Sequence, residues 1–179
     1  LPEVTAVTTQ GENYSGHFSE DGKRIVFISR NRLKHSHPQI YQRNLATQRD
    51  HRITFQDGEI YDVIYDKKSL HVLYSSSTDE IKENPTYIQN SLAKVDSQKP
   101  TLPLNPYGEE LAPAEIYMSS LDGKDIRRLT EIKGFDGELS LRSSRPEAAF
   151  VSLKENQQRL FLLNYLSGGV FRLTATADI

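Results

Sequence analysis

The sequence predicts an all-β protein built from repeated four-stranded antiparallel units, the architecture of β-propeller blades. Two observations support this class. One short motif recurs three times along the chain, and two strand-like runs joined by a tight turn precede each copy. Four short strands that repeat roughly every 40 to 45 residues are typical of propeller blades.

The recurring motif is an aliphatic–aromatic pair followed, at a fixed distance, by an arginine, an aliphatic residue and a threonine. Its copies align without gaps: Ile40-Tyr41 with Arg52-Ile53-Thr54, Ile116-Tyr117 with Arg128-Leu129-Thr130, and Leu160-Phe161 with Arg172-Leu173-Thr174. We interpret the pair as the start of the third strand of each unit and the closing residues as the fourth, outer strand.

The first two strands of each unit are predicted upstream of the motif, on either side of residues that tolerate tight turns. They are Tyr14–Phe18 and Ile25–Ile28, then Tyr61–Tyr65 and Leu70–Tyr74, then Leu139–Leu141 and Ala148–Val151. A continuous apolar run such as Ile25–Ile28 is typical of a strand that is covered on both faces. We therefore expect each sheet to be packed between neighbouring blades.

These patterns divide the chain into one propeller segment with four parts. Residues 1–9 form the outer strand of a preceding or closing blade, residues 10–59 the first blade, 60–137 the second and 138–179 the third. Residues 78–113 are an insertion between the second and third strands of the second blade, far longer than an ordinary hairpin loop. The insertion has a helix-capping start and a proline-rich second half.

Three blades do not close a ring, because propellers contain about four to eight blades. Two arrangements are therefore open: two copies of the chain pair to form a ring of about six blades, or further blades belong to a longer chain. We favour the second arrangement, because residues 3–8 look like an outer strand whose own blade is missing.

The turn and strand residues resemble the WD40-like (PD40) repeats of the TolB family. The resemblance rests on Phe18 to Phe27, which reads Phe-Ser-Glu-Asp-Gly-Lys-Arg-Ile-Val-Phe, and on Arg127 to Thr130, which reads Arg-Arg-Leu-Thr. The third blade departs most, with Ser144 to Glu147 in place of the Asp-Gly turn. The resemblance implies a protein-binding propeller of the bacterial periplasm. In that family the partner is a lipoprotein of the envelope-spanning Tol system.

Composition narrows the range of partners. A formal net charge of −2 gives no general attraction to nucleic acid or to an anionic membrane surface. No apolar run approaches the roughly 18 residues that span a bilayer. The sequence has no cysteine, which excludes disulfides and cysteine-based zinc sites. We expect a protein partner, no nucleic acid and no membrane insertion.

The expected binding face carries the loops between second and third strands and the connections between blades, because long loops on a rigid scaffold favour recognition. Its candidate residues are His35, His37, Asp57, Glu59, Tyr87, Tyr107, Asp136 and Glu138. Two histidines at alternate positions could chelate a transition metal, but the sequence offers no clear third ligand. The acidic residues also fit ordinary turn chemistry.

The sequence contains neither a Gly-x-Ser-x-Gly nucleophile elbow nor a phosphate-binding glycine-rich loop. We therefore predict a non-enzymatic binding module with no catalytic residues, no metal and no cofactor. The alternative is a metal-assisted polysaccharide lyase or hydrolase, because some TolB-like propellers resemble oligogalacturonate lyases. In that case His17, His35 and His37 are the first candidates for metal ligands.

Overall fold

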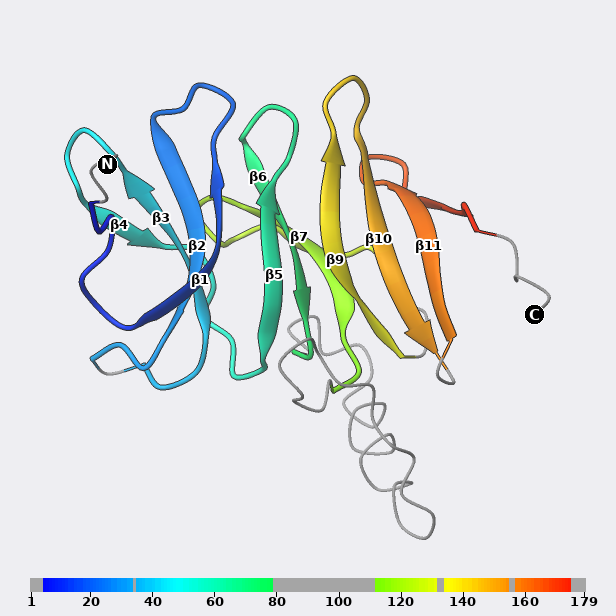
Figure 1. Ribbon diagram of the computed structural model, residues 1–179, viewed down its shortest axis with the longest axis horizontal. Helices are drawn as coiled ribbons and strands as arrows, with labels where there is room; N and C mark the ends of the chain where they lie inside the picture. The colour runs from blue at the N-terminus through cyan, green and yellow to red at the C-terminus, as the bar shows by residue number, and fades with distance from the viewer. Residues whose placement is uncertain (1–4, 34, 79–111, 132–133, 155–156, 175–179) are drawn as a thin grey trace, which may run out of the picture.

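The computed structural model describes residues 5–33, 35–78, 112–131, 134–154 and 157–174. Within these ranges the chain forms three four-stranded antiparallel sheets. Figure 1 shows the three sheets side by side, and in each the strands follow one another in chain order. This arrangement confirms the predicted all-β class and its four-stranded units. No helix in these ranges is long and apolar enough to cross a membrane.

Most strands begin and end close to the positions that the repeat predicts; the main difference is the first strand of the third sheet, which begins at Phe135 and not at Leu139. The first sheet contains β1 (Glu12–Phe18), β2 (Arg24–Arg30), β3 (Gln39–Asn44) and β4 (Asp50–Arg52); the second contains β5 (Ile60–Tyr65), β6 (His71–Ser76), β7 (Glu115–Ser120) and β8 (Ile126–Arg128); the third contains β9 (Phe135–Arg142), β10 (Glu147–Lys154), β11 (Gln157–Asn164) and β12 (Gly169–Arg172).

The aromatic residue of the motif stacks on an aromatic residue of the neighbouring strand in all three sheets. The ring pairs are Phe27–Tyr41, Tyr74–Tyr117 and Phe150–Phe161, with centroids 5.4 to 6.1 Å apart. On its other side each motif aromatic pairs with the motif arginine, in the order Arg52, Arg128 and Arg172. The repeat therefore encodes one strand register three times.

The threonine of the motif joins the outer strand to the strand inside it. The hydroxyl oxygens of Thr54 and Thr130 accept the backbone N–H of Ile40 and Ile116, each at 2.9 Å, and Thr174 does the same for Leu160 at 3.1 Å. This bond continues the strand pairing where the short outer strand ends, because it satisfies an N–H that would otherwise lack a partner. A hydroxyl on a β-branched residue suits this position.

The sheets pack face to face through two apolar layers. The layer between the first and second sheets includes Val26, Ile28 and Ile40 against Val72 and Tyr74. The layer between the second and third sheets includes Leu73 and Ile116 against Phe150 and Leu163. Each aromatic pair of the second and third sheets thus packs against the preceding sheet.

One carboxylate connects the first strands of all three sheets. The Ser15 hydroxyl on β1 donates to the carboxylate of Asp62 on β5, and the backbone N–H of Leu139 on β9 donates to its other oxygen at 2.7 Å. Strands β1, β5 and β9 are thereby held next to one another. The three sheets therefore contact one another through their first strands.

Two expectations concern segments that the structure describes only in part. Described residues 5–11 belong to no strand, and the blade that the outer strand at residues 1–9 would join is not among the described residues. The predicted insertion at residues 78–113 falls between β6 and β7, with residues 79–111 outside the described ranges. Both assignments, and the blade boundaries, stay predictions.

Candidate functional site

A pocket of about 350 Å³ lies where the first strands of the three sheets reach their hairpin turns. These turns lie at the upper end of the sheets in Figure 1. The pocket is lined by residues of β1, β5 and β9 and of the following turns: His17, Phe18, Glu20, Ile64, Tyr65, Asp66, Lys67, Ser69, Leu139, Ser140, Leu141 and Ser143. All three sheets contribute residues to this pocket, so it forms only when the sheets pack against one another.

Most polar groups around the pocket already form hydrogen bonds within or between the hairpin turns. The Asp66 carboxylate accepts the backbone N–H of Leu70 at 2.7 Å and that of His71 at 3.0 Å. The backbone N–H of Lys67 donates to the Tyr165 hydroxyl of the third sheet at 3.1 Å. Burial raises the pKa of Tyr65, whose hydroxyl accepts a hydrogen bond from Gln42 at 3.0 Å. The side chains of His17 and Ser140 are exposed in the lining, so their polar groups are accessible to a ligand.

The residues predicted for the loop face are spread over several places. His35 and His37 are exposed in the loop after β2, and Asp57 and Glu59 are exposed in the connection between β4 and β5. The side chain of His35 lies against the guanidinium of Arg52, with 2.7 Å between Nη1 of Arg52 and Nε2 of His35. Tyr87 and Tyr107 lie outside the described residues.

Asp136 and Glu138 are in a strand and not in the predicted connecting loop. Strand β9 begins at Phe135, because Phe135 and Asp136 pair with Leu153 and Ser152 of β10. Asp136 is completely buried, and neither carboxylate oxygen has a hydrogen-bond partner among the described residues. Glu138 is exposed at a bulge of β9, with a backbone φ of 54°. The two side chains therefore do not form a joint acidic surface.

Burial raises the pKa of the Asp136 carboxyl to about 6, because a charged carboxylate is poorly solvated inside the protein. The hydroxyls of Ser152 and Thr130 lie close enough to lower the pKa and offset part of this rise, although neither meets the geometry of a hydrogen bond to the carboxylate. The Thr130 proton itself is donated to Glu115 at 2.7 Å. Asp136 is thus an enclosed carboxyl that is still mostly ionised at pH 7 and takes up a proton near pH 6, and its complete burial keeps it out of contact with a partner.

The three histidines of the lyase alternative do not come together. His17 lines the hairpin pocket, whereas His35 lines a separate pocket on the first sheet. Within the described ranges, no three His, Cys, Asp or Glu side chains are grouped so that they could hold a metal ion. The structure therefore offers no assembled ligand set for this alternative among those residues.

Sequence reasoning missed the hairpin pocket. Its signal was present, because His17, Ile64 and Ser140 are each the next-to-last residue of the first strand that the repeat predicts for their sheet. These three positions line one pocket because of the way the sheets pack, and the repeat pattern does not predict that packing.

Comparison with known proteins agrees with the fold. No family model and no curated protein matches the sequence. Among solved structures, a protein assigned as TolB from Agrobacterium tumefaciens is 17% identical with a TM-score of 0.66, over 94% of this chain and 51% of that one. TolB from Acinetobacter baumannii is 20% identical with a TM-score of 0.64, over 95% of this chain and 34% of that one.

An enzyme carries the same fold. Hydrazine synthase from Kuenenia stuttgartiensis is 12% identical with a TM-score of 0.69, over 98% of this chain and 27% of that one. The chain thus spans about half or less of the length of these proteins. At these identities the similarity establishes architecture alone: the described strands have the β-propeller fold seen in TolB structures.

Proposed function

We propose that this chain is part of a non-enzymatic β-propeller that binds a protein partner, and that a segment of the partner enters the hairpin pocket. The observation that carries the proposal is that all three sheets line this pocket. Recognition at a site shared by several blades uses the rigidity of the whole scaffold, which reduces the entropy cost of binding.

The lining suits a short extended peptide. Apolar side chains of Ile64, Leu139 and Leu141 lie beside the exposed polar side chains of His17 and Ser140. Protein-binding sites combine apolar contact area with a few polar groups that fix orientation. The volume of about 350 Å³ is enough for one or two side chains of a partner.

The TolB-like fold supports the further proposal that the full protein is a propeller of about six blades exported to the periplasm. We propose that the other blades belong to the same polypeptide. Fractionation of cells of the native host followed by immunoblotting tests the location: recovery in the cytoplasmic fraction would overturn it.

Selection of peptides from a random phage-displayed library tests the binding proposal. The selected peptides should bind with micromolar affinity, and the Ser140→Trp variant should weaken binding at least about tenfold, because the indole fills the pocket. His17→Ala should weaken binding as well. Affinity is measured by isothermal titration calorimetry.

His37→Ala is the matched control, because His37 is also an exposed histidine, lies in the loop after β2 and does not line the pocket. Its affinity should equal that of the unchanged chain. If His37→Ala abolished binding and Ser140→Trp did not, the partner would bind the loop face and the pocket proposal would be wrong.

A further inference from the structure

The outward face of the first sheet carries an ion pair where the other two sheets carry apolar or small residues. Arg43 of β3 lies opposite Asp50 of β4. The same register is occupied by Ser119 and Ile126 in the second sheet, and by Leu163 and Val170 in the third. Ile126, Leu163 and Val170 belong to the apolar layers that join successive sheets. The first sheet is thus not built to meet another apolar blade at this position.

An arginine covers the aromatic pair on this face. The guanidinium of Arg32 lies 3.9 Å from the centroid of the Tyr41 ring and 5.5 Å from that of the Phe27 ring. In the second and third sheets the corresponding rings pack against aliphatic side chains of the preceding sheet. Arg32 takes their place, and stacking on the rings compensates part of the cost of burying its charge.

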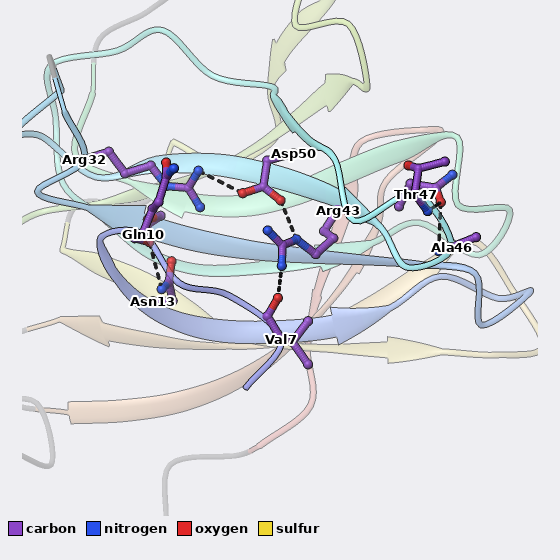
Figure 2. Close-up of polar contacts among 10 residues, drawn as sticks. Val7, Gln10, Asn13, Arg32, Arg43, Ala46, Thr47 and Asp50 are labelled. Carbon is purple, nitrogen blue, oxygen red and sulfur yellow. Dashed lines mark hydrogen bonds and ion pairs between the residues drawn. The ribbon is translucent and has the colours of Figure 1, made fainter. Parts of the chain in front are cut away.

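Arg32, Asp50 and Arg43 form a largely buried ion triad (Figure 2). Asp50 accepts from Nη1 of Arg32 at 2.9 Å and from Nε of Arg43 at 2.6 Å. The three side chains are 8%, 16% and 14% exposed in the order Arg32, Asp50, Arg43. One carboxylate serves two guanidinium groups, so the triad keeps a net positive charge away from most of the solvent.

The triad has unused hydrogen-bonding capacity. Nη2 of Arg32 is buried and has no hydrogen-bond partner among the described residues. Arg43 donates through Nη1 to the backbone carbonyl of Val7, and Arg32 donates through Nε to the Ser29 hydroxyl at 2.7 Å. An unpartnered N–H of a buried guanidinium is costly, and an additional acceptor at Nη2 would remove this cost.

A cavity of about 460 Å³ opens beside the triad. The residues that line it include Arg32, Arg43 and Arg52 but only one acidic residue, Asp50. Excess positive charge around a concave, partly enclosed space concentrates anions there.

We propose that this cavity is a binding site for a carboxylate group. A planar carboxylate offers two oxygens in the geometry that guanidinium groups bind best, and its charge would balance that of the triad. It can come from an aspartate or glutamate of a segment that covers this face, or from a small free acid. The site lies on the first sheet, apart from the hairpin pocket, and does not rest on the function proposed above.

Titration of the chain with succinate and with a blocked peptide containing one glutamate tests the proposal. Chemical shifts of arginine side-chain N–H groups report binding at the site by NMR. At least one probe should bind, and Arg43→Gln should weaken binding about tenfold or more. Asp50→Asn should tighten binding by a similar factor, because it removes the carboxylate that competes for the two guanidinium groups. Binding by succinate would identify a small-acid site, and binding by the peptide alone would identify a protein segment as the source.

The controls are succinamide, the matching glutamine peptide and the Arg142→Gln variant, whose arginine pairs with Glu147 on the third sheet. None of these amides should bind, and Arg142→Gln should leave affinity unchanged. The proposal is overturned if neither acid binds at about 10 mM, where a Kd in the millimolar range would be detected. It is also overturned if the amides bind equally well, or if binding appears only in Asp50→Asn, which would mean that Asp50 already fills the site.

Discussion

Asp136 connects burial to pH at the scale of a single residue. Its carboxyl has a pKa of about 6 in the folded chain, against an ordinary value of 3.8, because burial disfavours the charged form. Between these two pH values the folded state holds a proton that the unfolded state has lost. The free energy of unfolding therefore falls as the pH rises from about 4 to about 6.

We predict that Asp136→Asn raises the free energy of unfolding at pH 7.5 by about 3 kcal/mol, since the amide has no charge to desolvate. At pH 3.5, where the aspartate is mostly protonated in both states, the two chains should be almost equally stable. Urea unfolding at both pH values measures the difference. An equal effect of the substitution at pH 3.5 and pH 7.5 would contradict this account.

At the scale of elements, one turn sequence is used in two places. Ser19 to Lys23, between β1 and β2, and Ser120 to Lys124, which runs from the last residue of β7 toward β8, both read Ser-x-Asp-Gly-Lys. In each turn the serine hydroxyl donates to the aspartate at 2.6 Å, and the glycine has a positive φ, 66° for Gly22 and 72° for Gly123. The two turns differ in their surroundings. A Cβ at Gly123 would overlap the carbonyl oxygen of Ile53 on the first sheet, whereas a Cβ at Gly22 would meet nothing.

We predict that Gly22→Ala destabilises the chain by about 1 kcal/mol, the cost of a positive φ for alanine. Gly123→Ala should cost about 2 kcal/mol more, because it also forces the second sheet away from the first. Urea unfolding of the two variants side by side gives the difference. Equal losses would mean that the β7–β8 turn does not pack tightly on the first sheet.

At the scale of the molecule, the two outer faces of the stack differ in character. The outer face of the first sheet carries the Arg43–Asp50 ion pair. The outer face of the third sheet carries two exposed apolar side chains, Phe171 (63% exposed) and Leu173 (53% exposed). A ring of two copies would press this apolar face against the ion triad, and burying charges without matching partners is unfavourable. This mismatch favours further blades of a longer chain over pairing of two copies.

We predict that the double variant Arg43→Leu/Asp50→Val, which carries the residues of the third sheet at these positions, associates more strongly than the unchanged chain. Apolar residues at both ends allow head-to-tail contact between copies. Light scattering over a range of concentrations should show a larger average mass for the variant. If the masses were the same, the ion pair would not be what prevents association.

The sequence by itself determined that each unit has four strands and in which order they follow one another, because these follow from short-range patterns. The aliphatic–aromatic pair and the Arg-x-Thr motif place the third and fourth strands of each sheet, and the closing threonine bonds back to the third strand in all three copies. The exposed positions of His35, His37, Asp57 and Glu59 also follow from their place in connecting segments.

Only the tertiary structure decided which residues of different blades meet. It placed Asp136 inside β9, assembled the hairpin pocket from three sheets, and set Arg32 over the rings of Phe27 and Tyr41. It also joined Ser15 and Leu139 through the carboxylate of Asp62. The physical reason is that a repeat fixes what each blade is, whereas the contacts between blades depend on the few positions at which the copies differ.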